Sequence, residues 1–194
     1  MTTDVEPLAP PPGQAQLGPL VDRFDAAADR ALEHLRGRPF VDRIFLLASE
    51  YGDFSAIWHG ASLIRCVFTR RPDQVVVLAA ALGAESLIVN QGAKRVFRRP
   101  RPTVAGDARL PVRRPSTSSF PSGHASAAAF AATVLSQWDR HRAGALWYVP
   151  AAVVAVSRAH VRIHHASDVV GGIIVGRALG LVARRALRRW GPVH

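Results

Sequence analysis

The sequence predicts an all-α protein, a helical bundle embedded in a membrane with an amphipathic helix near its N-terminus. Three observations predict it: long apolar runs, aromatic residues near their ends and a glycine repeat. The runs are rich in alanine and leucine and too long for strands, which favours helices. Gly172, Gly176 and Gly180 recur at a spacing that lets transmembrane helices approach closely. The aromatic residues near segment ends, where membrane interfaces select them, are Trp58, Trp138, Trp147 and Tyr148.

The N-terminal part precedes the apolar runs. Residues 1–18 are proline-rich and acidic, which predicts a disordered tail. Residues 19–36 place apolar side chains at helical spacing opposite a charged face, so we expect an amphipathic helix that lies on a membrane surface or packs on the bundle. A break follows, and a short second helix is expected at 40–52. Residues 19–194 are predicted to form a single domain.

Five apolar stretches follow, and each is close to or shorter than the roughly 20 residues that span a bilayer core. If the segment at 40–52 also crosses, six spans result. Polar residues interrupt several stretches and keep the hydropathy modest, so a soluble helical bundle remains the alternative. The five stretches are Phe54–Phe68, Val75–Gln91, Ala125–Trp138, Ala145–Val156 and Val169–Ala183.

Two of the interrupting residues, Glu85 and Asn90, lie in one apolar run. An ionisable group inside a membrane is a candidate functional residue, although a hydrogen bond from the arginine-rich segment explains it equally well. Arg177 is expected to extend toward the membrane interface or to pair with Glu85.

The charge balance indicates anionic partners. The 194-residue chain carries 25 basic and 14 acidic residues, a formal net charge of +11. Phosphates, acidic lipid headgroups and nucleic acid are the partners that such a balance favours. The single cysteine excludes an intrachain disulfide, and no HExxH motif, paired aspartates or cysteine cluster points to a metal site. We therefore expect neither a metal nor another cofactor.

Three polar clusters lie between the apolar runs. With five spans, segments 92–120 and 157–168 fall on the same side of the membrane, so the clusters are expected to share one site. The first cluster, "KRVFRRPRP" at 94–102, is by itself typical of a basic loop that binds acidic lipid.

The second cluster, "SSFPSGHAS" at 118–126, predicts a helix N-terminus. Pro121 ends the preceding segment, Ser122 can cap, and the following residues strongly favour a helix. The free N–H groups and the dipole at such an end attract an anion, and Gly123 lets a ligand approach the backbone. Taken alone, the segment is equally consistent with an ordinary capped helix that carries His124 on its surface.

The third cluster is "SRAHVRIHHASD" at 157–168. His164 and Asp168 are four residues apart and would share one face of a helix. A carboxylate in that position can accept a hydrogen bond from one imidazole nitrogen and leave the other free as a nucleophile or base. His165 could compete for the same aspartate, whereas His160 is too far away. A polar loop of solvated histidines is the alternative.

Taken together, the clusters follow three spacings, Lys94–x6–Arg101–Pro102, then Pro121-Ser122-Gly123-His124, then Ser157-Arg158–x5–His164–x3–Asp168. This pattern resembles the three-part signature of the type 2 phosphatidic acid phosphatase superfamily, which includes lipid phosphatases and vanadium haloperoxidases. The resemblance selects Arg101 rather than Arg99, and His164 rather than His160 or His165.

The resemblance implies hydrolysis of phosphate monoesters or diphosphates through a phosphohistidine, without a metal. It implies that His164 attacks phosphorus, that Asp168 fixes the imidazole tautomer, and that His124 protonates the leaving oxygen and then activates water. The residues that it implies for holding the phosphate are Lys94, Arg101, Ser122, Gly123 and Arg158.

A polar site at the end of membrane helices suits an amphiphile whose tail stays in lipid. The candidate substrates are polyprenyl phosphates or diphosphates, polyprenyl-phosphosugar phosphates, phosphatidic acid and phosphatidylglycerol phosphate. The small chain is similar to compact bacterial members of the family, which favours a polyprenyl-linked substrate. We expect a multi-pass protein of the cytoplasmic membrane. A cytoplasmic N-terminus with five spans puts the site on the cytoplasmic side, and a sixth span would reverse this.

Two alternatives remain. A vanadate-dependent haloperoxidase would use the same anion pocket, although those relatives are larger, soluble proteins. A non-enzymatic basic protein would bind membranes or nucleic acid through charge alone. The arginines lack the interleaved aromatic residues and the recognition helix typical of nucleic-acid modules, so no nucleic-acid partner is expected.

Overall fold

The computed structural model describes residues 17–102, 109–110, 112, 117–139 and 141–190. Every regular element within these ranges is helical, so the predicted all-α class is confirmed for the described part of the chain. The predicted disordered tail falls almost entirely on residues 1–16, which lie outside the described residues. The disordered tail therefore stays a prediction. The assignment of residues 19–194 to a single domain stays a prediction as well.

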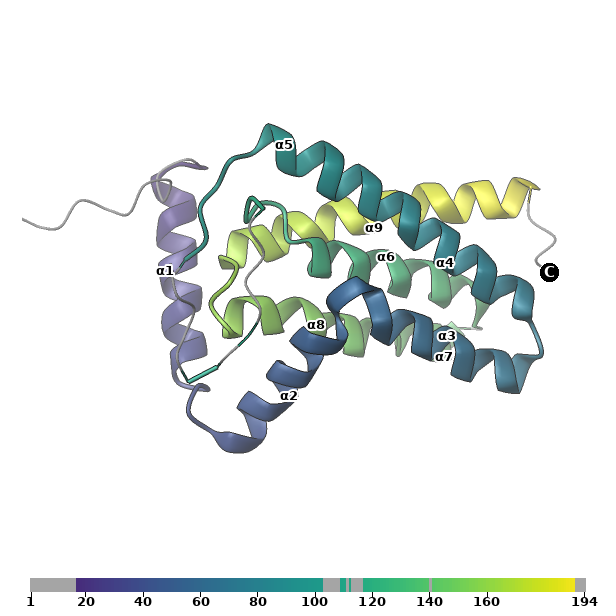
Figure 1. Ribbon diagram of the computed structural model, residues 1–194, viewed down its shortest axis with the longest axis horizontal. Coiled ribbons are helices and arrows are strands. Elements are labelled where there is room, and N and C mark those ends of the chain that lie inside the picture. The colour runs from purple at the N-terminus through teal and green to yellow at the C-terminus, as the bar shows by residue number, and fades with distance from the viewer. Residues whose placement is uncertain (1–16, 103–108, 111, 113–116, 140, 191–194) are drawn as a thin grey trace, which may run out of the picture.

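The helices follow one another with short connections, apart from the long segment between α5 and α6 (Figure 1). In chain order they are α1 (Pro19–Glu33), α2 (Pro39–Tyr51), the 3₁₀ turn η2 (Asp53–Ser55), α3 (Ala56–Thr69), α4 (Pro72–Ser86), the π-helical turn η3 (Leu87–Ala93), α5 (Lys94–Val96), α6 (Gly123–Trp138), α7 (His141–Ala145), α8 (Tyr148–His160) and α9 (Ala166–Trp190).

Helix α6 forms the centre of the bundle, where it packs against α4, α8 and α9 (Figure 1). Residues 125–135 of α6 are all buried. The predicted glycine repeat explains how α9 comes so close. A Cβ on Gly172 or Gly176 would overlap the carbonyl oxygens of Ser122 and Ser126, and one on Gly180 would lie 2.8 Å from the Thr133 Cβ. The close helix approach that the repeat predicts is confirmed.

Two helical segments of the described residues are long and apolar enough to cross a bilayer, Pro72–Val96 and Ala166–Arg189. The first joins α4, η3 and α5 into one rod. The other predicted stretches are helices too, but α3, α6 and α8 have 14, 16 and 13 residues. At about 1.5 Å of rise per residue they are shorter than the roughly 30 Å bilayer core. The prediction of five or six spans is therefore supported only in part.

Helix α1 lies across one end of the bundle and packs on α8 and α9 (Figure 1). The sequence left two placements open for this amphipathic helix, on a membrane surface or packed on the bundle, and the structure shows the second. Its outer face exposes Leu20 and Phe24. One sequence expectation is wrong: Trp58 does not lie at an interface, because it is 1% exposed and packs in the core around α6.

Candidate active site

A cavity of about 650 Å³ brings together segments that are far apart in the sequence. Its polar wall comes from η2, α3, α4, η3, α5, α6, α8, the loop after α8 and Thr117 before α6. Apolar side chains, including Leu82 and Ala127, line another part of it. The predicted site residues on this wall are Lys94, Gly123, His124, Arg158 and His164.

His164 lies in the loop between α8 and α9 and is buried. Its Nε2 is 3.1 Å from Nη1 of Arg101, which also donates a hydrogen bond of 2.7 Å to the Ile163 carbonyl. Because a guanidinium only donates, Nε2 accepts with its lone pair and the ring proton resides on Nδ1. Burial lowers the pKa of His164 to about 3, since the imidazolium would lose its solvation. The ring is therefore neutral at physiological pH.

Asp168 lies behind His164 and is completely buried. Its Oδ2 is 3.7 Å from Nδ1 of His164 and accepts a hydrogen bond of 2.8 Å from the His165 backbone N–H. The expectation that His164 and Asp168 share a helix face is wrong, because α9 begins at Ala166. They are close for another reason: an acid in the first turn reaches back to the free N–H at the start of the helix.

Two further predicted cations complete the polar wall. Arg158 is buried, and its Nη1 donates to the hydroxyl and, at 3.2 Å, to the carbonyl of Ser49 on α2. Lys94 opens α5 directly after the π-helical turn, a feature often found at functional sites. Arg101 and Arg158 both lie close enough to act on the charge of Lys94. Like charges held so near one another favour an anion between them.

Ser122 caps α6, as predicted. Its hydroxyl accepts a long hydrogen bond of 3.5 Å from the Ala125 N–H, and its own N–H donates to the Asp168 carbonyl at 3.0 Å. Ser122 is fully buried and is not among the residues that line the cavity, so its side chain acts here as a helix cap. Gly123 does line the cavity. A Cβ there would lie 3.2 Å from Asn90 Oδ1 and 3.4 Å from Lys94 Nζ.

His124 faces the cavity from the first turn of α6, and its Nε2 is 2.8 Å from Oδ1 of Asp53. Asp53 stands in the turn after α2, where Phe54 and Ser55 adopt left-handed φ values of 53° and 59°. Gly52 leaves room for the ring, because a Cβ there would lie 2.6 Å from its Cδ2. Sequence reasoning missed Asp53, since no spacing links this short turn to α6.

The two polar residues of the apolar run Val75–Gln91, Glu85 and Asn90, also line the cavity. Glu85 is buried and accepts a hydrogen bond from the Ser126 hydroxyl on α6. Glu85 does take part in a hydrogen bond between helices, but the expectation that its donor comes from the arginine-rich segment is wrong, because the donor is this serine. Arg177 contacts the ring of Tyr148, with 5.8 Å between its Cζ and the ring centroid, instead of pairing with Glu85.

Arg99 lies on the far side of Asp168, where its Nη1 donates to Asp168 Oδ1 at 2.6 Å. The motif spacing had set this arginine aside in favour of Arg101. The structure places the two on opposite sides of the His164–Asp168 pair, with Arg101 at Nε2 of the imidazole. The carboxylates of Asp168 and Asp25 outweigh burial and raise the pKa of Arg99.

Cations, a neutral imidazole and a helix N-terminus surround one cavity, and two helices of the described chain are long enough to cross a bilayer. Fold and site together define a class of protein, a membrane enzyme that handles a phosphate-like anion. The chain belongs to the PAP2 superfamily, whose family model matches residues 74–192. It is a hydrolase of this family that acts on lipid phosphoesters, so the resemblance noted in the sequence is confirmed.

Two curated relatives are bacterial. The chain is 36% identical over 141 residues to the decaprenylphosphoryl-5-phosphoribose phosphatase of Mycolicibacterium smegmatis, covering 71% of this chain and 74% of that protein. It is 31% identical over 103 residues to the putative undecaprenyl-diphosphatase YbjG of Escherichia coli, covering 53% and 52% respectively.

Two solved structures share the fold. The transmembrane PAP2 type phosphatidylglycerolphosphate phosphatase of Bacillus subtilis superposes with a TM-score of 0.70 at 22% identity, over 90% of each chain. LpxE of Aquifex aeolicus superposes with a TM-score of 0.67 at 23% identity, over 84% of this chain and 95% of that one. The helical arrangement is therefore that of transmembrane phosphatases.

Proposed function

We propose that the protein hydrolyses a phosphomonoester or diphosphate of a polyprenyl-linked lipid through a phosphohistidine on His164, without a metal. One observation carries the proposal: His164 and His124 line the same cavity, together with Lys94 and Arg158. A nucleophile, an acid and an anion-binding wall are the parts that such a reaction requires.

His164 is the nucleophile in this proposal. Its neutral Nε2 attacks phosphorus, an N–P bond forms and the P–O bond to the lipid breaks. Arg101, which donates toward Nε2 in the free protein, turns its N–H groups to a phosphate oxygen and frees the lone pair. Asp168 stabilises the positive charge that develops on the ring, since its Oδ2 lies near Nδ1.

His124 acts as the acid and then as the base. It gives a proton to the leaving lipid oxygen and, in the second step, takes one from the water that breaks the N–P bond and releases inorganic phosphate. Its position in the first turn of α6 and its contact with Asp53 support this role.

Positive charges and helix donors hold the phosphate. Lys94, Arg101 and Arg158 bind its non-bridging oxygens, and the Gly123 N–H adds a donor at the start of α6. Phosphoryl transfer depends mainly on positioning and charge stabilisation, so three fixed cations can do what a metal ion does in other phosphatases. The hydroxyl of Ser122 contributes by capping the helix that carries this donor.

The substrate is proposed to be amphiphilic because the cavity combines charged and apolar walls. The names of the curated relatives support a polyprenyl chain: one is a decaprenylphosphoryl-5-phosphoribose phosphatase and the other a putative undecaprenyl-diphosphatase. Phosphatidic acid and phosphatidylglycerol phosphate are the other candidate substrates, and the assay described below includes them.

The cell location forms part of the proposal. We place the protein in the cytoplasmic membrane as a multi-pass protein, with Pro72–Val96 and Ala166–Arg189 as two of its spans. The number of further spans stays a prediction from the sequence. The cytoplasmic position of the active site depends on that number, so it stays a prediction too. Cysteine labelling from either side of sealed vesicles would determine it.

The test is a panel of lipid phosphates offered to the detergent-purified protein in EDTA, with free phosphate as the readout. We expect phosphate release that is fastest with polyprenyl substrates and absent in His164→Ala. Activity that requires added magnesium, or survives His164→Ala, would contradict the proposed mechanism. Bromide oxidation in the presence of vanadate and added hydrogen peroxide would favour a haloperoxidase. Salt-sensitive binding without turnover would favour a charge-driven binding protein.

A further inference from the structure

A buried chain of charged side chains connects helix α1 to the back of the candidate site. Arg99 joins its two ends. One guanidinium nitrogen, Nη1, donates to Asp168 Oδ1 at 2.6 Å, and the other, Nη2, donates to Asp25 Oδ2 on α1 at 2.7 Å. All three side chains are buried, with Asp25, Arg99 and Asp168 at 8%, 3% and 0% exposure.

Asp25 also binds the start of α9, which carries Asp168. Its Oδ1 accepts the Ser167 backbone N–H and its Oδ2 accepts the Ser167 hydroxyl, both at 2.7 Å. The Ser167 hydroxyl is in turn 2.7 Å from Nη1 of Arg99. A carboxylate from α1 thus accepts hydrogen bonds from the first turn of α9, as a capping residue of α9 itself would.

Burying the charges of Asp25, Arg99 and Asp168 costs free energy unless each charge keeps its partner. Arg99 occupies one oxygen of Asp168, and the His165 N–H occupies the other, on the side of His164. With both oxygens held, the carboxylate cannot rotate away from the His164 imidazole. The orientation of Asp168 therefore depends on Arg99, and that of Arg99 depends on α1.

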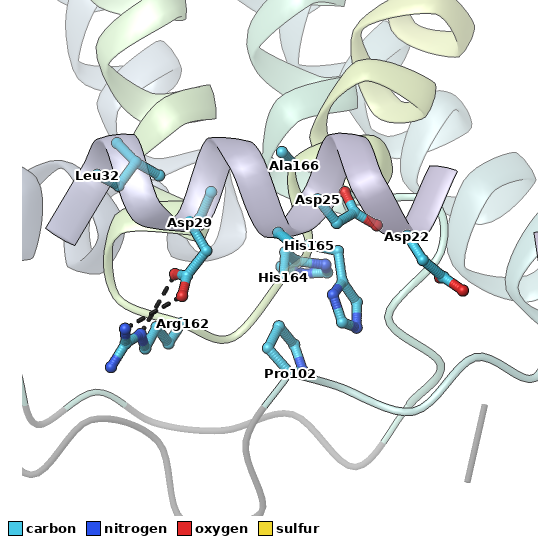
Figure 2. Close-up of a pocket in the computed structure, with 11 residues that line it drawn as sticks. Asp22, Asp25, Asp29, Leu32, Pro102, Arg162, His164, His165 and Ala166 are labelled. Carbon is cyan, nitrogen blue, oxygen red and sulfur yellow. Dashed lines mark hydrogen bonds and ion pairs between the residues drawn. The ribbon is translucent and has the colours of Figure 1, made fainter. Parts of the chain in front are cut away.

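Figure 2 shows α1 passing over the loop that holds His164 and His165, with Asp29 of α1 extending down to Arg162 of that loop. A second cavity of about 320 Å³ lies there, lined by residues of α1 and by both histidines. The loop is thus not packed solidly from this side. Discrete bonds such as those of Asp25 have to hold it in place.

We propose that Arg99 and Asp25 are positioning residues for the reaction, so that helix α1 forms part of the catalytic machinery by fixing Asp168 behind His164. The inference rests on the proposed role of His164 as nucleophile. It assigns a function to an arginine outside the motif spacing and to a helix outside residues 74–192, which the family model matches.

The chain offers a matched control. Asp29 lies one helical turn from Asp25 and also ties α1 to the bundle, through Arg36 at 2.7 Å and Arg162 at 3.1 Å. Among the described residues, none of the bonds of Asp29 reaches Asp168. Asp29→Asn leaves the bonds between Asp25, Arg99 and Asp168 in place. Arg162, which lies in the loop of His164, keeps its ion pair with Glu33 on α1 at 2.9 Å in this variant.

The experiment compares Asp25→Asn, Arg99→Lys and Asp29→Asn in the full-length protein in detergent. A lysine keeps the charge but lacks the fork that bridges two carboxylates. We expect kcat to fall about 10- to 100-fold in the first two variants, by analogy with residues that orient metal ligands, whose loss has effects of that size. KM and the inhibition constant of inorganic phosphate should stay within about threefold, because the anion site itself is unchanged. Asp29→Asn should keep the wild-type kcat.

A folded site is recognised by its phosphate inhibition constant, so a drop in kcat caused by unfolding is excluded. If Asp25→Asn does not purify in a phosphate-binding form, Arg99→Lys decides the question alone. Wild-type kcat in Arg99→Lys, or an equal loss in Asp29→Asn, would overturn the inference. An active His164→Ala would instead refute the proposed function, so the two failures are distinguishable.

Discussion

The two histidines of the cavity are held in different ways. His164 is buried in a loop, and its aspartate is completely buried and bonded on both oxygens. His124 stands on the first turn of a helix, and its partner Asp53 has a side chain that is 41% exposed. The difference matches the proposed tasks. A nucleophile benefits from a ring held in one place, whereas an acid and base has to exchange protons with its surroundings, which the more exposed Asp53 allows.

The largest expected effect comes from removing the buried ring. His164→Ala should lower phosphate release roughly 10⁶-fold, the loss typical when a nucleophile is removed. Free phosphate measured in EDTA with a polyprenyl substrate checks this. His165→Ala is the matched control, because it keeps the backbone N–H that binds Asp168 and should retain most of the activity. Similar losses in both variants would contradict the assignment of His164, rather than His165, as the nucleophile.

Asp168→Asn should lower kcat by about 10⁴-fold, as in other enzymes where the carboxylate behind an active-site imidazole is neutralised. The amide would place an N–H where Asp168 now accepts one, either from Arg99 or from the His165 backbone. The measurement is kcat under substrate saturation. A change confined to KM would show that this carboxylate serves binding rather than chemistry.

A smaller loss is expected on the His124 side. In Gly52→Ala the new Cβ would lie 2.6 Å from Cδ2 of His124 and push the ring away from its place. A displacement of about 1 Å in a catalytic group can cost about 10²-fold in rate. Gly60→Ala is the control, since nothing lies within 4 Å of its Cβ. If both variants have the same kcat, the position of this ring does not limit the reaction.

The smallest expected effect concerns the protonation of His164, which should not change between pH 8 and pH 5. Because burial lowers the pKa of His164 to about 3, its ring should stay neutral from pH 8 to pH 5. NMR of ¹⁵N-labelled histidine in detergent micelles, assigned with His164→Ala, measures this directly. In the unfolded chain the same ring takes up a proton below about pH 6.5. His164 should therefore lower the free energy of unfolding as the pH falls below that value. A midpoint near 6.5 in the folded protein would contradict the buried, neutral ring.

Local patterns predicted much of the fold. The apolar runs identified the helices, and the glycine repeat indicated a close approach between helices, which α9 makes with α6. Patterns of this kind succeed because they depend on neighbours in the same helix. Trp58 shows where they fail. A tryptophan near a segment end is equally suited to an interface or to a core, and only the packing around α6 decides between them.

The site was predictable where the motif spacing constrains it. Lys94, His124, Arg158 and His164 line one cavity, as a shared site requires. The helical argument for His164 and Asp168 was right about their proximity and wrong about its cause, because it could not tell that α9 begins at Ala166.

The supporting residues could not be found in this way. Asp53 meets His124, and Asp25 meets Arg99, through contacts between segments far apart in the chain. Such contacts depend on how the helices are arranged in three dimensions. Nothing in the composition of the turn at 53–55 or of helix α1 marks these two aspartates apart from their neighbours.

The central claim is tested most directly by trapping the phosphoenzyme. His124→Gln is mixed with a ³²P-labelled aryl phosphate, whose good leaving group needs no acid, and quenched in alkali, where phosphohistidine survives. Since the second step lacks its base, label should accumulate on a peptide that contains His164. It should be absent when His164→Ala is added to the same variant. Label on any other residue, or label that persists in the double variant, would contradict the account.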